Sequence, residues 1–138
     1  MDKLIEQLKR HEGVRSHVYT CTSGFETIGV GRNISPSGLG LSDDEIEYLL
    51  ANDIKRCDKE LSYNFKWYLS LNRCRQQAMI NLCFNLGLPT LLKFKNALKS
   101  MEEGAFDEAA DHFLQSRWAE QVGDRAIEVT DIIRNGTY

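Results

Sequence analysis

The spacing of apolar residues changes once along the chain and divides it into two parts. From residue 42 onward, apolar positions recur every three or four residues, which is the period of an amphipathic helix. The first stripe predicts a long helix near 43–61, which opens at a capping box formed by Ser42 and Glu45. The later stripes predict four more helices, near 74–86, 91–101, 106–114 and 124–134. The chain beyond residue 42 is therefore expected to be helical.

The residues before 42 follow a different pattern. A short helix is predicted over 2–11, where Leu4, Ile5 and Leu8 share one face. Between 14 and 34, β-branched and aromatic residues are punctuated by glycines. That pattern is typical of a small antiparallel hairpin or meander.

These elements predict an α+β fold that is mostly α. The 138 residues are the size of one domain, 1–138. Within it we expect a small β lobe near 13–42, a connecting helix near 43–61, and a helical lobe near 62–138 that also includes the helix 2–11.

Composition excludes several classes of protein. With 42% hydrophobic residues, 27% charged residues and only 2 prolines, the chain is neither a disordered tail nor a collagen-like repeat. No apolar run approaches the ~18 residues of a membrane span. The first residues are too charged for a signal peptide, so we expect a protein made in the cytoplasm.

Charge is unevenly distributed. Residues 61–100 contain six lysines and arginines and no aspartate or glutamate, whereas residues 101–138 contain nine acidic and three basic residues. By itself this pattern favours a solvated helical surface whose charges pair with the acidic last third. A positive face toward an anionic polymer is the alternative interpretation.

The cysteines do not form a metal-binding pattern. They stand at four separate positions, Cys21, Cys57, Cys74 and Cys83. None forms C-x-x-C and no histidine lies at zinc-finger spacing, so neither a metal nor an organic cofactor is indicated. The last three fall on apolar helical faces, where reduced cysteine behaves as a small hydrophobe.

Two residues of the first third are candidates for chemistry. Glu12 stands where the first helix gives way to the hairpin. A carboxylate at such a junction can face a crease, where partial burial favours its protonated, acid form. Thr27 lies in a predicted strand. Neither is distinctive alone, because an isolated terminal glutamate is usually a surface charge.

The spacing of these residues resembles the signature of the T-even-type phage lysozymes, which cleave peptidoglycan. That signature is a Glu, eight residues, an Asp or Cys, five residues, and a Thr. This chain has Glu12, Cys21 and Thr27 at those intervals. Blocks at 77–87, 106–110, 116–118 and 134–138 continue the resemblance in order, so it covers nearly the whole chain.

The resemblance implies a lysozyme-like two-lobed fold and a set of site residues. Glu12, Cys21 and Thr27 would be catalytic: Glu12 as the general acid, Cys21 and Thr27 as groups that position or activate water. The implied substrate-binding residues are Phe84, Ala97, His112 and Arg125. The resemblance also places Arg125 close enough to pair with Glu12 and implies inversion at the anomeric carbon.

Two departures from the family pattern matter. The segment between Arg32 and Ser42 is shorter than in the T-even enzyme, so sugar contacts on that side do not carry over. Cys21 stands where the best-known members have Asp. An unperturbed thiol with a pKa of ~8.5 is only slightly ionised at neutral pH. The thiol can therefore act as a base, as a water-orienting group, as a nucleophile when ionised, or be inert.

The implied function is that of an endolysin: a hydrolase that cuts the β-1,4 bond between N-acetylmuramic acid and N-acetylglucosamine and so lyses the bacterial host. We expect bacterial peptidoglycan as partner, no nucleic acid, a monomer, and residence in the host cytoplasm before release to the wall. Two alternatives stay open. One is a cysteine-dependent cell-wall peptidase or amidase with His17 or His112 as base, and the other is a non-catalytic peptidoglycan-binding module.

Overall fold

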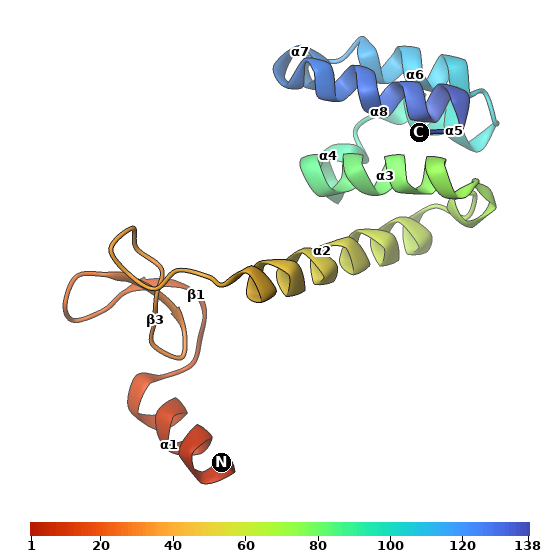
Figure 1. The fold of residues 1–138 in the computed structure, drawn as a ribbon. Helices are drawn as coiled ribbons and strands as arrows, with labels where there is room; N and C mark the ends of the chain where they lie inside the picture. The colour runs from red at the N-terminus through yellow and green to blue at the C-terminus, as the bar shows by residue number, and fades with distance from the viewer. The chain divides into compact units, whose positions relative to one another are not determined.

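The computed structural model describes residues 1–138 and divides them into two units, Met1–Leu49 and Leu50–Tyr138. We call them the N-terminal unit and the helical unit. Figure 1 follows the chain through both, with helix α2 (Asp43–Asn64) beginning in the first and ending in the second. The expected class is confirmed, because eight helices accompany one small sheet.

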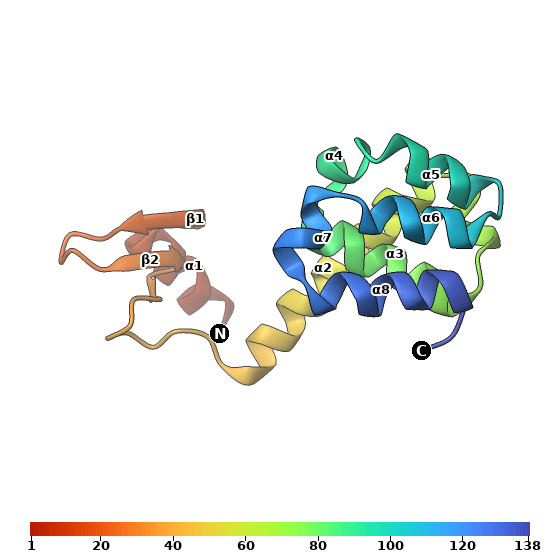
Figure 2. The same cartoon turned by 90° about the horizontal axis from the view of Figure 1, so that it is seen from above.

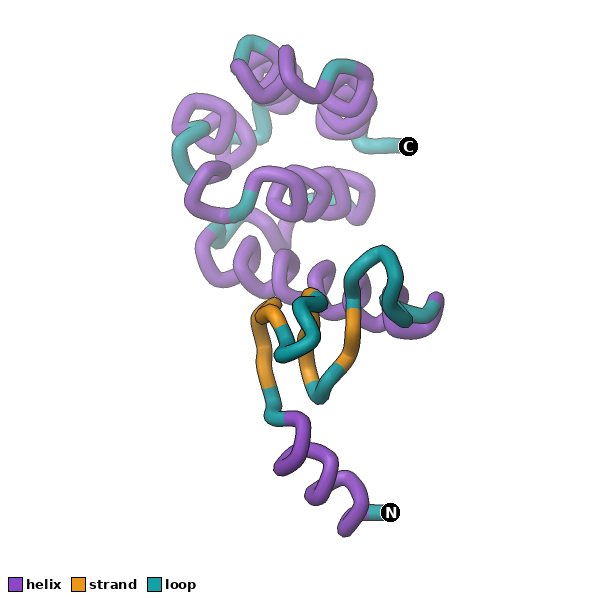
Figure 3. The backbone as a smooth tube through the Cα atoms, turned by 90° about the vertical axis from the view of Figure 1, so that its left-hand side faces the viewer, coloured by secondary structure: helices purple, strands orange, loops and turns teal.

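The N-terminal unit is a helix followed by a three-stranded meander, whose short strands Figure 3 shows in orange. Its elements are α1 (Asp2–Glu12), β1 (Arg15–Thr20), β2 (Glu26–Gly29) and β3 (Arg32–Asn33). The sheet is antiparallel with the order β1-β2-β3. Arg15 pairs with Gly29 and Tyr19 with Thr27, and the register shifts by a bulge between these two pairs.

Two glycines turn the chain between β2 and β3. Gly29 and Gly31 each have a φ of +69°, a conformation that residues with a side chain rarely adopt. They reverse the chain within a few residues, so that β3 returns along β2 with Ile28 opposite Arg32. The glycine-punctuated pattern in the sequence is the origin of this tight meander.

The start of α2 is fixed by the capping box that the sequence predicts. The backbone N–H of Ser42 donates to Glu45 Oε1 at 2.9 Å, and the Glu45 N–H donates to Ser42 Oγ at 3.4 Å. Arg32 strengthens this corner, because its Nη1 donates to Glu45 Oε1 at 2.7 Å and to Gly40 O at 3.0 Å. The guanidinium holds the pKa of the Glu45 carboxyl far down, at about 2.

The helical unit contains most of the core. Beyond α2 its elements are a 3₁₀ turn (Tyr68–Ser70), α3 (Arg73–Leu86), α4 (Leu88–Leu91), α5 (Lys95–Glu102), α6 (Phe106–Leu114), α7 (Arg117–Val122) and α8 (Asp124–Asn135). The stripe near 91–101 is divided, because a turn after Leu91 separates α4 from α5. Helix α7 was not predicted. Figure 2 shows α6 beside α8, an arrangement that their packing confirms.

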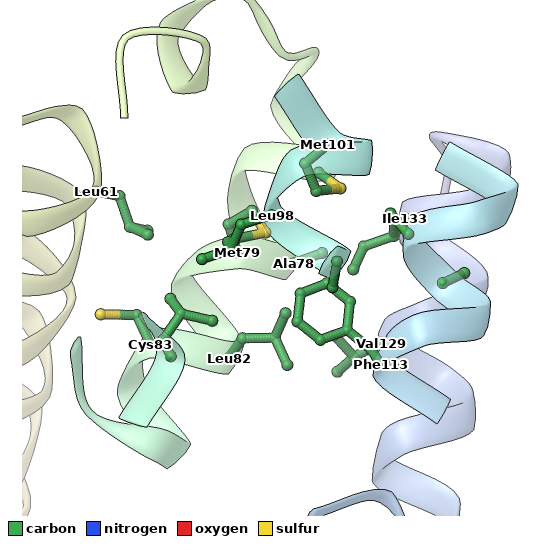
Figure 4. Packing of buried hydrophobic residues seen from close by; sticks show 14 of the residues in the cluster. Leu61, Ala78, Met79, Leu82, Cys83, Leu98, Met101, Phe113, Val129 and Ile133 are labelled. Carbon is green, nitrogen blue, oxygen red and sulfur yellow. The ribbon is translucent and has the colours of Figure 1, made fainter. Parts of the chain in front are cut away.

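The core of this unit lies where α3, α5, α6 and α8 meet. Figure 4 shows its centre, where Met79, Leu82, Leu98, Phe113 and Ile133 converge. Burying one such side chain stabilises the fold by roughly 1.5–3 kcal/mol. All five belong to apolar stripes whose spacing is visible in the sequence, so the packing follows the predicted helical faces.

Arg75 links the start of α3 to the end of α8 by hydrogen bonds. Its Nε donates to Ile133 O at 2.7 Å and its Nη2 to Arg134 O at 3.0 Å, so that it satisfies carbonyls that a helix end leaves unpaired. The guanidinium also lies 3.7 Å from the centre of the Phe106 ring. Asn72 adds a hydrogen bond from Nδ2 to Gly136 O at 3.0 Å.

The cysteines are free thiols. Cys57 and Cys83 are buried in the core at 2% exposure, whereas Cys21 and Cys74 are partly exposed. None of the helices combines the length and the apolar character that crossing a membrane requires.

Candidate active site

Glu12 is the last residue of α1 and lies close to the turn after β2. The pairing of Arg15 with Gly29 brings the end of α1 and the turn at Gly31 to the same end of the sheet. A Cβ placed on Gly31 would lie 2.8 Å from Glu12 Oε2 and 3.1 Å from its Cδ. The carboxylate is thus packed against the bare backbone of Gly31. Glu12 is exposed, so the partial burial expected from the sequence does not arise within the N-terminal unit.

Cys21 and Thr27 lie together at the other end of the β1–β2 hairpin. Cys21 opens the turn, where its N–H donates to Phe25 O and its carbonyl accepts from the Gly24 N–H, both at 2.9 Å. Thr27 is buried at 4% exposure in the middle strand. Its hydroxyl donates to Phe25 O at 2.9 Å and lies within hydrogen-bonding reach of the Cys21 thiol.

The turn lowers the pKa of Cys21. The largest cause is the hydrogen bond from the Phe25 backbone, and burial, the second-largest, opposes it. Smaller contributions from the Ser23 backbone, the Thr27 hydroxyl and the Gly24 backbone also lower the pKa. Donors aimed at a sulfur stabilise the thiolate over the thiol. The turn therefore shifts Cys21 toward its thiolate form relative to an unperturbed thiol.

Glu12 lies near one end of the small sheet, and Cys21 and Thr27 lie near the other end. Gly31, against which Glu12 packs, follows Thr27 by four residues. The Cα atoms of Thr27 and Gly31 are therefore at most about 14 Å apart, even for a fully extended chain.

The helical unit contains a groove of about 710 Å³ that is lined by two of the expected substrate-binding residues, Phe84 and Arg125. Phe84 is 44% exposed. Arg125 is oriented by Asn81, whose Oδ1 accepts from Arg125 Nε at 3.2 Å and from Nη2 at 2.8 Å. Tyr138 also lines the groove and donates to Gln77.

Asn81 and Tyr138 are residues that sequence reasoning missed as part of this groove. Both lie in blocks that carry the resemblance, at 77–87 and 134–138, but nothing in the sequence connects Asn81 with Arg125, 44 positions later. The pairing of Arg125 with Glu12 concerns both units and stays a prediction.

The other two expected substrate-binding residues do not line the groove. Ala97 is 2% exposed and belongs to the hydrophobic core, which argues against a direct contact with a sugar. His112 is half-buried near the end of α6. No three histidine, cysteine or carboxylate side chains converge in the way that metal ligands do.

The fold and this site define a class. A helix that ends in a glutamate, a three-stranded sheet with a thiol–threonine pair, and a long helix leading into a helical unit with a groove are the layout of a lysozyme-like α+β protein.

The comparisons with known proteins identify the family. The model described as Phage lysozyme matches residues 9–131. "Probable T4-type lysozyme 1" of Dictyostelium discoideum is 29% identical over 159 residues, covering 96% of this chain and 94% of that protein. "Endolysin" of Salmonella phage P22 is 29% identical over 116 residues, covering 80% and 77%.

A third similar protein is much longer. "Pre-baseplate central spike protein Gp5" of Enterobacteria phage T4 is 29% identical over 160 residues, and the match covers 96% of this chain but 28% of that protein. The chain belongs to the phage lysozyme family, and it is a lysozyme-type glycoside hydrolase that acts on the cell wall.

Proposed function

We propose that the chain hydrolyses the β-1,4 bond between N-acetylmuramic acid and N-acetylglucosamine in bacterial peptidoglycan, with Glu12 as the general acid. The observation that carries the proposal is the arrangement of the signature residues around one small sheet. Glu12 lies against Gly31, and Cys21 lies in a turn that stabilises its thiolate beside Thr27. An exposed carboxyl group can reach a bridging oxygen, and a thiolate can accept a proton from water.

The proposed hydrolysis transfers two protons. Glu12 gives its proton to the glycosidic oxygen as the bond to the anomeric carbon breaks. A water molecule attacks that carbon from the opposite face, and its proton passes to the Cys21 thiolate. Whether the single hydrogen of the Thr27 hydroxyl goes to Phe25 O or to the Cys21 sulfur, the hydroxyl oxygen can accept the second hydrogen of the water and fix its orientation. Attack from the opposite face inverts the anomeric configuration.

The helical unit contributes binding in this proposal. Phe84 presents an exposed aromatic face in the groove, and an aromatic ring packs against the apolar face of a sugar. Arg125, held by Asn81, offers donors to the carbonyl and carboxylate groups of peptidoglycan. The proposed enzyme is a monomer with no nucleic-acid partner, present in the host cytoplasm until it reaches the wall.

The test is the Glu12→Gln variant, assayed on purified peptidoglycan for new reducing ends and for new free amines. We expect wild type to release reducing ends without amines, and the variant to lose activity by several orders of magnitude, because glutamine has no proton to give. Glu26→Gln is the matched control, since Glu26 is an exposed carboxylate on the neighbouring strand and should be dispensable. Retained cleavage by Glu12→Gln would refute the proposal.

The role of Cys21 is tested separately. A base or water-orienting role predicts that Cys21→Asp stays active and extends its activity to lower pH, because a carboxylate is ionised there and a thiol is not. A covalent nucleophile predicts loss of turnover in the same variant and a thioether-linked sugar on the wild-type protein by mass spectrometry. We expect the first result.

A cysteine-dependent peptidase is the competing use of the same thiolate. It needs a histidine within hydrogen-bonding reach of Cys21. His17 is exposed on β1, and its Nδ1 is 3.1 Å from Ser16 Oγ, which gives this ring nitrogen another partner. New free amines in the wild-type digest would favour that function over the proposed one.

A further inference from the structure

Gly31 is one of three glycines at which an added Cβ would come within 3.0 Å of another residue, and the only one of them that faces Glu12. A Cβ at Gly31 would lie 2.8 Å from Glu12 Oε2, 3.1 Å from Cδ and 3.2 Å from Cγ. The whole end of the Glu12 side chain therefore lies on the bare Cα. Gly29 has the same φ of +69°, but a Cβ there would meet nothing within 4 Å.

The carboxylate of Glu12 has no other support within the N-terminal unit. None of the hydrogen bonds or ion pairs in this unit involves it, whereas Glu45 is held by Arg32 and Ser42. The position of the Glu12 carboxyl group in this unit is set by packing against Gly31. A side chain that is held only by packing moves when the surface beneath it changes.

We infer that Gly31 is a positioning residue for Glu12, and that the absence of a side chain at position 31 sets where the carboxyl group delivers its proton. The inference rests on the proposed function and adds to it the residue that places the acid. Gly31 itself touches neither the sugar nor the reacting atoms in this account. Its role is to leave the volume that Glu12 occupies.

A methyl group at position 31 should displace the acid without unfolding the protein. The atoms that it would meet are the far end of a flexible side chain, which can rotate away at little cost. The backbone strain of a non-glycine residue at φ +69° is shared with position 29. Gly31→Ala and Gly29→Ala therefore share the unfavourable positive φ, and only the first carries the contact with Glu12.

The catalytic consequence follows from geometry. A displacement of about 1 Å at a reacting group can cost on the order of 100-fold in rate. We expect Gly31→Ala to lower kcat by about tenfold or more with KM changed less than twofold, because the sugar contacts assigned to Phe84 and Arg125 are untouched. Gly29→Ala should keep both constants close to wild type.

The experiment combines these kinetics with a direct observation of Glu12. The ¹³C resonance of its side-chain carboxyl carbon is assigned by its loss in Glu12→Gln and is followed at pH 7 in wild type, Gly31→Ala and Gly29→Ala. Thermal melts of the two alanine variants confirm matched folding. We expect the resonance to move in Gly31→Ala and to stay in place in Gly29→Ala.

The outcomes separate the inference from the proposed function. An unmoved resonance in Gly31→Ala, or an equal loss of kcat in both variants, would overturn the positioning role of Gly31. A moved resonance with unchanged kcat would show that Glu12 is displaced without consequence, which would overturn both the inference and the proposed role of Glu12 as acid. A moved resonance with a fall in kcat confined to Gly31→Ala supports both.

Discussion

Removing the Arg75 guanidinium should destabilise the helical unit by a few kcal/mol. Arg75→Met keeps an unbranched stem but loses the donors to Ile133 O at 2.7 Å and Arg134 O at 3.0 Å, and the charge 3.7 Å from the Phe106 ring. Hydrogen bonds from charged groups contribute roughly 1.5–3 kcal/mol each and a cation–π contact about 0.5–2 kcal/mol. Because these terms are not additive at a half-buried site, we expect a loss of about 2–4 kcal/mol.

Urea unfolding followed by tryptophan fluorescence measures this loss. Both tryptophans, Trp67 and Trp118, lie in the helical unit, so the signal reports on the part of the chain that Arg75 holds. With a slope of roughly 2 kcal/mol/M, the midpoint should fall by about 1–2 M. Arg73→Met is the control: Arg73 is exposed, forms no hydrogen bond or ion pair, and should shift stability by less than about 0.5 kcal/mol. Equal midpoints for the two variants would refute the reasoning.

Three further predictions follow from single side chains. Cys21 should be the first cysteine to react with a disulfide reagent at pH 7, because its pKa is lowered in the hairpin turn. Cys83 should react only after unfolding, because burial raises its pKa to about 12. Fast labelling of Cys83 in the folded protein would contradict this. Arg32 keeps the pKa of Glu45 at about 2 instead of 4.5, so this ion pair stabilises the fold fully above pH 4.5 and ceases to do so as the pH falls toward 2. In acid titrations, the free energy of unfolding of an Arg32→Met variant should therefore fall less over that pH range than that of wild type. Met79→Ala should cost about 2–5 kcal/mol in urea unfolding, since Met79 is fully buried, and a cost below 1 kcal/mol would mean that the core closes around the space.

The helices were predictable because their signal is local. The period of apolar residues predicts the long helix from residue 43, and the structure extends it only from 61 to Asn64. Helix α7 was missed because six residues are fewer than two turns, too few for a periodic stripe. Its start is nevertheless marked in the sequence, where Ser116 Oγ accepts from the Ala119 N–H at 3.2 Å.

The candidate site could be proposed from the sequence in its residues but not in its electrostatics. The intervals between Glu12, Cys21 and Thr27 are visible in the sequence, but the lowered pKa of Cys21 depends on where the backbone N–H groups of a four-residue turn point. At position 97 the sequence reasoning and the packing of the side chain disagree. The resemblance implies that Ala97 contacts the substrate, yet Ala97 is buried in the core, where a small apolar residue lets helix α5 pack closely.

The turn that opens at Cys21 offers a reason why a thiol can stand where the resemblance leads us to expect a carboxylate. The donors that surround the sulfur are mainly backbone N–H groups, and these are present whatever residue 21 is. They stabilise negative charge on an oxygen as well as on a sulfur. A carboxylate is already ionised at neutral pH and gains little, whereas a thiol, which is mostly neutral there, is shifted toward its charged form. The turn therefore favours negative charge next to Thr27 on a thiol as well as on a carboxylate, and under the proposed function the base at this position can be either residue.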